Sequence, residues 1–235
     1  ELQVEIAHIY EALEPVQRLA SSLKQYHAPP LRIICTPPLA QQLLPQSIAA
    51  LRRRLPDVPC SLLSQPTRDI VRHLLLRESD LGLSLHDPDH ADIDCQVIAQ
   101  GKLQLLAPHG WLQPKQKYIS LQDLAGQAMV GLEGHDPLNP VLDNKLHALR
   151  PAPVIHTRVQ THQMMRSMVE AGEGLAIVDP FTALGARSNG LDVCPLSPAV
   201  PISLYALTFK HAAPSSAIQT LLVIITEQAE AMLAS

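Results

Sequence analysis

The sequence predicts an α/β protein made of two Rossmann-like lobes that are joined by two crossover strands. Short apolar segments alternate with amphipathic helical patterns along most of the 235 residues, an order typical of sheets covered by helices. Residues 31–45 and 159–180 each combine a strand and a helix in one compact unit. Two such units in one chain indicate two lobes with a cleft between them, because open α/β sheets bind ligands at the carboxyl ends of their strands.

Residues 1–25 predict a long helix with one narrow apolar stripe. Its apolar residues alternate at spacings of four and three, the a/d pattern of a heptad repeat: Leu2, Ile6, Ile9, Leu13, Val16, Ala20 and Leu23. Such a helix either pairs with a second helix or packs as an ordinary amphipathic helix on its own domain. Pro15 lies inside it and costs about 3 kcal/mol or bends it. We expect a linker and dimerisation helix here.

The β/α alternation starts after Pro29 and Pro30. Strands or extended segments are expected at 31–35, 58–63, 80–85, 97–107, 128–132, 154–159, 175–178 and 201–210. Helices are expected at 39–55, 68–77, 121–124 and 138–149, from Thr161 to Gly172, near Ala183, and from 214 to the C-terminal end. The sheets should be mostly parallel, since each helix carries the chain back over the sheet. We predict lobe I over 31–104 plus 206–235 and lobe II over 105–205.

The segment 159–180 has the clearest local pattern. Residues 165–169 place apolar side chains at helical spacing, and Gly172 and Gly174 supply the positive φ that ends a helix. Residues 175–178 are a short apolar run of the length of a strand buried on both faces. Asp179 follows that strand, which places it at the predicted cleft.

Composition excludes several classes of protein. A net charge of −4 and 3% aromatic residues argue against nucleic-acid binding by this segment. Cys35, Cys60, Cys95 and Cys194 have no C-x-x-C spacing, so we expect reduced thiols in a cytoplasmic protein and no zinc. No stretch approaches the ~20 apolar residues of a membrane span, and no signal-peptide pattern is present. Without a catalytic or metal-binding motif, we expect neither an enzyme nor a cofactor.

The order of heptad helix, linker and two β/α lobes resembles the LysR-type transcriptional regulators, in particular their linker helix and effector-binding domain. The stretches that carry this resemblance lie at 35–41, 132–137, 159–184, 188–191, 199–201 and 211–217. Their succession is similar to the branch of the lysine-biosynthesis activator and the octopine and nopaline (opine) catabolism regulators. The resemblance covers essentially the whole chain, and its specificity lies in order and spacing rather than in a single motif.

The resemblance implies a periplasmic-binding-protein type II-like fold that binds a small effector between its lobes. It further implies a cytoplasmic homodimer or homotetramer, no membrane contact, and DNA binding only through a winged helix-turn-helix absent from this sequence. The chain is thus expected to be a fragment. An amino-acid-binding protein of a transporter is the alternative, but it would be monomeric and leave the heptads without a role.

The candidate ligand-binding residues of lobe I follow its first three strands: Thr36, Gln41, Ser64, Thr67, Ser84 and His86. Thr36 precedes a helix whose N-terminus suits a carboxylate, and Gln41 lies one turn further on. The structural alternatives are a helix cap for Thr36, a turn for Ser64 and Thr67, and a surface loop for His86. Cys35 lies beside this site, but no resolving cysteine is evident, which disfavours a redox role.

The candidates of lobe II are Glu133, Asp136, Thr161 and Asp179. Asp136 before Pro137 has the alternative role of a helix cap, and so has Thr161. Glu133 and Asp179 suit a cationic ligand end, whereas the hydroxyls of lobe I suit a carboxylate. An amino acid, in particular a basic amino acid, or an opine satisfies both requirements.

Overall fold

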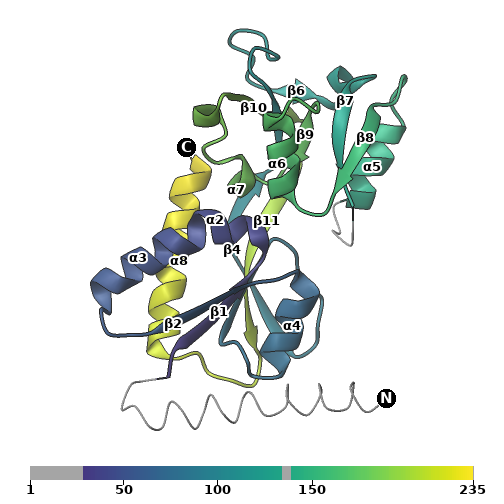
Figure 1. Ribbon diagram of the computed structural model, residues 1–235. Coiled ribbons are helices and arrows are strands. Elements are labelled where there is room, and N and C mark those ends of the chain that lie inside the picture. The colour runs from purple at the N-terminus through teal and green to yellow at the C-terminus, as the bar shows by residue number, and fades with distance from the viewer. Residues whose placement is uncertain (1–28, 134–138, 235) are drawn as a thin grey trace, which may run out of the picture.

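The computed structural model describes residues 29–133 and 139–234 as two lobes stacked end to end (Figure 1). The predicted helix over residues 1–25 and the candidate residue Asp136 lie outside the described residues. The α/β fold with several sheets confirms the predicted fold class.

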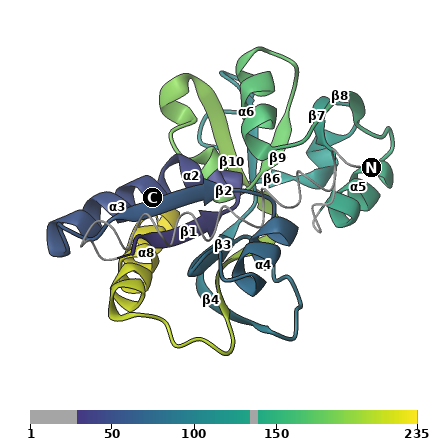
Figure 2. The same ribbon diagram turned by 60° about the horizontal axis from the view of Figure 1, so that its bottom comes forward.

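Lobe I contains a five-stranded sheet of order β2-β1-β3-β11-β4. The strands are β1 (Leu31–Cys35), β2 (Cys60–Ser64), β3 (Leu81–Ser84), β4 (Ile93–Lys102) and β11 (Pro201–Phe209). Its helices are α2 (Pro37–Gln41), α3 (Leu43–Arg54), α4 (Thr67–Leu75) and α8 (Ser216–Ala234). Helices α3 and α8 lie on one face of the sheet and α4 lies on the other (Figures 1 and 2). Neighbouring residues of β1 serve the two faces: Ile33 belongs to the core under α3 and α8, and Ile34 to the core under α4.

Lobe II contains a four-stranded sheet of order β6-β10-β5-β9 and a parallel pair, β7-β8. The strands are β5 (Gln104–Pro108), β6 (Ile119–Ser120), β7 (Ala128–Leu132), β8 (Val154–Val159), β9 (Ala176–Val178) and β10 (Leu191–Ser197). The helices are η1 (Leu121–Leu124), α5 (Asn139–His147), α6 (His162–Glu170), α7 (Pro180–Ala183) and η2 (Arg187–Asn189). A bridge between Met129 and Leu175 connects the pair to the larger sheet. As predicted, residues 175–178 are fully or almost fully buried.

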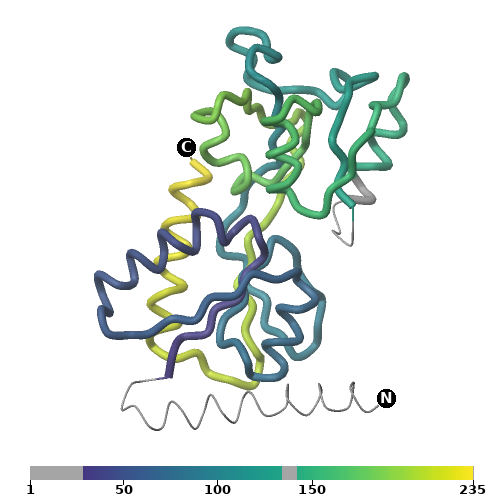
Figure 3. The backbone as a smooth tube through the Cα atoms, viewed as in Figure 1, coloured from purple at the N-terminus to yellow at the C-terminus, as the bar shows by residue number. Residues whose placement is uncertain are grey.

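Two extended passages connect the lobes, one along β4 into β5 and one along β11 (Figure 3). The two strands pair antiparallel from Pro201 opposite Lys102 to Phe209 opposite Ile93. Because the chain leaves lobe I along one of them and returns along the other, both sheets are mixed, and the expectation of mostly parallel sheets was wrong. The exact domain boundaries stay a prediction.

Other elements differ from the prediction in detail. The helix expected at 39–55 is two helices, α2 and α3, separated at Gln42, whose φ of −133° is not helical. The proline turn at 36–38 is the start of α2. Strand β10 was not predicted, because Pro195 and the polar Asp192 interrupt its apolar pattern.

Helix α8 is, by length and composition alone, long and apolar enough to cross a membrane, so the prediction that no stretch approaches this length was wrong. Its apolar face is used inside lobe I instead. Ile218, Leu221, Ile224, Ile225 and Ala229 are buried against the sheet and α3. One buried stripe on a helix that is otherwise partly exposed is typical of an amphipathic helix that packs on a lobe.

Candidate functional site

A cleft of about 740 Å³ opens where strand ends of both lobes face each other. This volume lies within the range of small-molecule sites. Lobe I contributes the turn after β1, the N-terminus of α4 and the loop after β3, with Thr36, Pro37, Pro38, Pro66, Thr67, Arg68, Val71, Leu85, His86, Asp87 and Pro88. Lobe II contributes the end of β7 and the connection from β8 to α6, with Leu132, Glu133, Gln160, Thr161 and His162.

Thr36 has a buried hydroxyl on the cleft wall. It occupies the cap position of α2 in extended conformation, but its side chain makes no capping bond. Only 7% of the residue is exposed, and its Oγ1 has no hydrogen-bond partner in the part of the chain that the structure describes. A buried polar atom without a partner costs about 1–3 kcal/mol, so the cleft wall carries a hydroxyl whose hydrogen-bonding capacity is not used by the described residues.

Thr67 and His86 are held at the cleft by a buried serine. Ser84 Oγ lies 2.9 Å from Thr67 Oγ1, donates to the His86 carbonyl at 2.8 Å and accepts from the His86 amide at 3.0 Å. Ser84 is completely buried and does not line the cleft. Its place is therefore behind the wall, where it fixes the turn after β3 and the first residue of α4.

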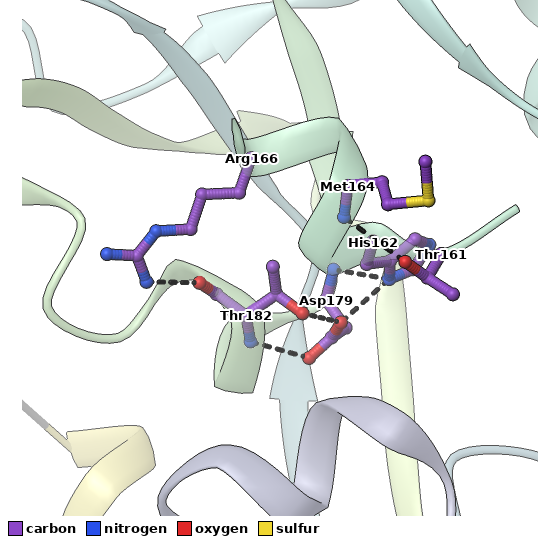
Figure 4. Close-up of polar contacts among 6 residues, drawn as sticks. All are labelled: Thr161, His162, Met164, Arg166, Asp179 and Thr182. Atoms are coloured by element: carbon purple, nitrogen blue, oxygen red, sulfur yellow. Dashed lines mark hydrogen bonds and ion pairs between the residues drawn. The ribbon is translucent and has the colours of Figure 1, made fainter. Parts of the chain in front are cut away.

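The lobe II wall is built from the start of α6 and the end of β7. Thr161 caps α6, because its Oγ1 accepts the Met164 amide at 3.1 Å (Figure 4). Glu133 follows β7, its amide donates to the Val159 carbonyl at 2.7 Å, and its side chain is exposed. Together with α4, α6 brings a second helix N-terminus to the cleft, and such ends favour negatively charged groups.

Asp179 lies behind this wall rather than on it. It caps α7 through the Thr182 amide at 2.9 Å, and it also accepts the Thr182 hydroxyl at 2.6 Å. His162 Nδ1 lies 2.7 Å from Asp179 Oδ2, the oxygen that also accepts the Thr182 hydroxyl (Figure 4). Burial alone would raise the pKa of this carboxyl, but the hydrogen bonds and charge of His162, with the bonds of Thr182, lower the pKa below its ordinary value of 3.8. Asp179 is therefore an ionised structural carboxylate.

Arg166 joins α6 to α7 from the side away from the cleft. Its Nη1 donates to the carbonyls of Thr182 and Leu184 at 3.0 and 2.7 Å, and its Nε donates to Glu170 at 3.0 Å. Only 9% of the residue is exposed. Helices α6 and α7 are thus tied together by Asp179 at one point and by Arg166 at another, so that they act as one rigid unit.

The structure brings five of the predicted site residues together: Thr36, Thr67, His86, Glu133 and Thr161. It places Gln41 and Ser64 on the surface away from the cleft, because α2 ends at Gln41 and Ser64 is the last residue of the edge strand β2. The expectation that Asp179 faces the cleft was wrong, because its buried carboxylate caps α7 and contacts His162. Ser84 is likewise behind the wall.

Four polar residues of the cleft were not predicted: Arg68, Asp87, Gln160 and His162. Arg68 is the second residue of α4 and His162 the first residue of α6. Both residues lie at the start of a helix that follows a strand, and this position could have predicted them. The sequence analysis used it only for Thr36 and Thr161.

A second, smaller cavity of about 30 Å³ lies within lobe II. Its wall is mostly apolar and includes Met129, Leu142, Leu146 and Met165. Leu132 and His162 line both this cavity and the cleft. The smaller space has room for one or two water molecules.

The cysteines are free thiols, of which Cys35 and Cys194 are buried. Burial raises the pKa of Cys35 to about 12. Burial, with the charge and hydrogen bond of Asp87, also raises the pKa of Cys95 to about 12. Because the thiolate is the reactive form, these environments disfavour thiol chemistry next to the cleft.

Comparisons with known proteins agree with this architecture. The profile of the LysR substrate binding domain matches residues 24–230. Transcriptional activator protein LysR of Escherichia coli (strain K12) is 28% identical over 218 residues, which are 91% of this chain and 68% of that protein. Regulatory protein NocR of Agrobacterium tumefaciens (strain T37) is 23% identical over 201 residues, 84% of this chain and 66% of that protein.

Solved structures show the same fold. HinK, a LysR family transcriptional regulator from Pseudomonas aeruginosa, has a TM-score of 0.72 and 22% identity, over 95% of this chain and 79% of that chain. The effector binding domain of QuiR in complex with shikimate has a TM-score of 0.70 and 16% identity, over 87% of this chain and 98% of that chain.

The chain belongs to the LysR substrate binding domain family. It is the effector-binding regulatory domain of a LysR-type transcriptional regulator, and its relatives confirm the branch that the sequence resembles. Those relatives are regulators, not enzymes, and they do not favour the transporter alternative.

Proposed function

We propose that the cleft binds an amino-acid-like effector, such as a basic amino acid or an opine. Binding would change the arrangement of the lobes within a homo-oligomer and thereby control DNA binding by a winged helix-turn-helix domain. The observation that carries the proposal is the distribution of groups in the cleft: Thr36 of lobe I, whose hydroxyl has no partner among the described residues, and the acidic Glu133 of lobe II line the same space.

The lobe I wall suits the carboxylate of such a ligand. Thr36 Oγ1 is a donor with no partner among the described residues, and Thr67 begins α4, whose first amides are not used within the helix. Arg68 adds a positive charge at the same helix end. Its nearest acidic partner within the described chain, Asp69, lies 3.8 Å away, a distance at which an exposed pair contributes little.

The acidic side chains of the cleft suit the cationic end of the ligand. Glu133 is exposed on the lobe II wall, and Asp87 is exposed on the loop after β3. Within residues 29–133 and 139–234, neither carboxylate forms an ion pair with a basic side chain. An ammonium or guanidinium group that lies between the lobes would gain a charge-assisted hydrogen bond of about 1.5–3 kcal/mol.

The proposed homo-oligomer is a dimer or tetramer in the cytoplasm. Its support in the described chain is the edge strand β2, on which Leu62 is 44% and Leu63 42% exposed. Adjacent exposed leucines on an unpaired strand edge favour contact with a second copy. Sedimentation of the purified chain tests this, since a monomer at micromolar concentration would contradict it.

Isothermal calorimetry against L-lysine, L-arginine, L-ornithine, octopine and nopaline tests the effector class. We expect at least one compound to bind, and Glu133→Gln to weaken binding of the cationic ligands by about 10-fold. Glu230→Gln, an exposed change at the far end of α8, is the matched control and should bind normally. Binding of uncharged or purely anionic metabolites alone would overturn the proposed class.

A further inference from the structure

We propose that the β7–β8–α5 unit of lobe II moves as one body on a hinge at Leu175, and that the small cavity of lobe II is the space it moves into. The unit comprises β7, β8 and α5, which lie together at one side of the lobe (Figures 1 and 2). The motion itself requires no ligand, whereas its effect on effector binding rests on the proposed function.

The unit is held together from within. Strands β7 and β8 pair in parallel along all five residues of β7. Arg158 of β8 also connects the other two elements, because its Nη1 donates to Asp143 of α5 and to the Leu132 carbonyl of β7, each at 3.4 Å. The three elements can therefore shift together without separating from one another.

The attachment of the unit to the rest of the lobe is concentrated at Leu175. Its amide donates to the Ala128 carbonyl at 2.9 Å, and its carbonyl accepts the Val130 amide at 2.8 Å. An exposed bond from the Thr157 hydroxyl reaches Glu173 at 3.4 Å, two residues before Leu175. Bonds gathered at one place fix a point but allow rotation about it, as hinges at the ends of elements do.

From this hinge, β7 and β9 separate toward the cleft. Met129 and Leu175 form a parallel bridge, but the strands that continue from them belong to different sheets. The cavity of about 30 Å³ lies where the strands part, since Leu132 of β7 and Ile177 of β9 both line it. Side chains that border a cavity lack packing partners on one side. A swing of the unit toward β9 therefore gains contacts while the bonds at Leu175 persist.

The boundary between the unit and the rest of the lobe is apolar around the cavity. Apolar contacts are not directional, so a small shift breaks no bond there. Methionine adapts to a changed boundary more readily than other apolar residues, because its side chain is unbranched and flexible. The unit contributes Met129, Leu146 and Ile155, and the rest of the lobe contributes Leu103, Met165 and Ile177.

The motion reaches the effector cleft at Glu133. This residue follows β7 directly and lines the cleft, and its amide donates to the Val159 carbonyl at 2.7 Å, so it moves with both strands. The opposite part of the lobe II wall belongs to α6, which Thr161 caps and Arg166 ties to α7. A swing of the unit thus changes the distance between Glu133 and the start of α6, and it adjusts the cleft to its ligand.

Relaxation-dispersion NMR of the ligand-free chain tests the motion, because it detects collective exchange on the μs–ms timescale. We expect the backbone amides and methyl groups of β7, β8 and α5 to show dispersion with one common exchange rate. The methyl groups of Leu105 on β5 and Leu196 on β10 should give flat curves. Flat curves throughout the unit, or unrelated rates in its three elements, would overturn the proposal.

Two matched substitutions test the role of the cavity. Val130→Ile adds one methyl group to a buried side chain that lines the cavity, and should reduce the dispersion amplitude of the whole unit at least about 3-fold. Val159→Ile makes the same change at a buried residue of the same unit that does not line the cavity, and should leave the amplitude unchanged. Equal amplitudes in the two variants would overturn the assignment of the cavity.

A third variant keeps this test open where Val130→Ile does not fold. Leu142 lines the cavity from α5 and is only partly buried, so Leu142→Ala enlarges the cavity at a tolerant position. We expect a larger dispersion amplitude across the unit, since the unit then has more room to move. An unchanged amplitude in L142A would contradict the role of the cavity.

Effector binding separates this inference from the proposed function. At saturation with the best compound among L-lysine, L-arginine and octopine, the dispersion of the unit should disappear. V130I should bind that compound at least about 5-fold more weakly than V159I does. Unchanged dispersion at saturation would overturn the coupling to the cleft. If none of these compounds binds, the proposed effector class fails, and the ligand-free dispersion still decides whether the unit moves.

Discussion

At the residue scale, the cleft differs from the core in how its polar atoms are satisfied. Ser84 and Asp179 are completely buried, and each has several hydrogen-bond partners. Thr36 is nearly as buried, yet its hydroxyl has no partner within the described residues. The first two stabilise the fold, whereas the hydroxyl of Thr36 costs stability, and we propose that it serves as a donor to the effector.

Thr36→Val tests this difference. The change keeps the shape of the side chain and removes the unpartnered hydroxyl, so the free energy of unfolding should stay level or rise by up to about 1 kcal/mol. Effector affinity should fall about 10-fold, measured by calorimetry. Thr226→Val on α8, whose hydroxyl donates to the Leu222 carbonyl at 2.9 Å, is the control and should leave affinity unchanged. A large loss of stability in T36V would show that the hydroxyl serves the fold.

Asp179→Asn tests the buried carboxylate through pH. A carboxyl whose folded pKa lies below its ordinary value of 3.8 contributes stability above that value and loses it as the pH falls through the folded pKa. The free energy of unfolding of the native chain should therefore exceed that of D179N by about 1–3 kcal/mol at neutral pH. This difference between the two free energies of unfolding should become smaller below about pH 4, which urea unfolding at several pH values measures. A gap that stays constant from pH 6 to pH 3 would contradict this account.

At the element scale, the turn between α6 and β9 depends on Gly174. Its φ is +116°, and a Cβ atom there would lie 2.4 Å from the Ala128 carbonyl oxygen. Gly172 has a φ of +89° but open space around it. The turn therefore tolerates a side chain at Gly172 far better than at Gly174.

Gly174→Ala should reduce the free energy of unfolding more than Gly172→Ala does. Both lose about 1–2 kcal/mol from the left-handed conformation, and G174A additionally pushes β7 away from the chain before β9. We expect a further difference of at least about 1 kcal/mol in urea unfolding. Equal stability of the two variants would mean that β7 and the turn do not pack as the structure has them.

The same elements show what a sequence can predict. Apolar spacing over 165–169 and the glycines behind it predicted α6 and its end correctly, because both signals are local. The break at Gln42 and strand β10 depend on neighbours that are distant in sequence, so they were missed. For the site, the order of strand ends predicted which loops meet. The orientation of Asp179 was not predictable, since it depends on His162 and Thr182 in the folded lobe.

At the scale of the whole molecule, the lobes meet at Gly101 in the crossover strand β4. A Cβ atom at Gly101 would lie 2.8 Å from Pro180 Cγ and 2.9 Å from Leu233 Cδ2. Pro180 follows Asp179 and belongs to α7, and Gln42 donates to the Leu184 carbonyl at 3.3 Å from the other lobe. The α6–α7 unit that carries His162 thus rests directly on the connection between the lobes.

Gly101→Ala should therefore change the arrangement of the lobes. The side chain of Leu233 can move aside, but the ring of Pro180 is stiff. The added methyl group should therefore displace α7 from β4. We expect effector affinity to fall by at least about 5-fold, a loss that reflects coupling between the crossover and the cleft. Solution X-ray scattering should show a changed radius of gyration. Gly110→Ala is the control: its φ of +81° costs stability, but the added Cβ atom meets nothing within 4 Å, so affinity and scattering should stay unchanged. Unchanged affinity and scattering in G101A would contradict the coupling.

A crystal structure of the chain grown with its tightest-binding amino acid or opine tests the central claim most directly. The account predicts ligand density between the lobes, with the carboxylate at Thr36 and the start of α4 and the cationic end at Glu133. Density on the outer surface, or contacts with one lobe alone, would contradict it.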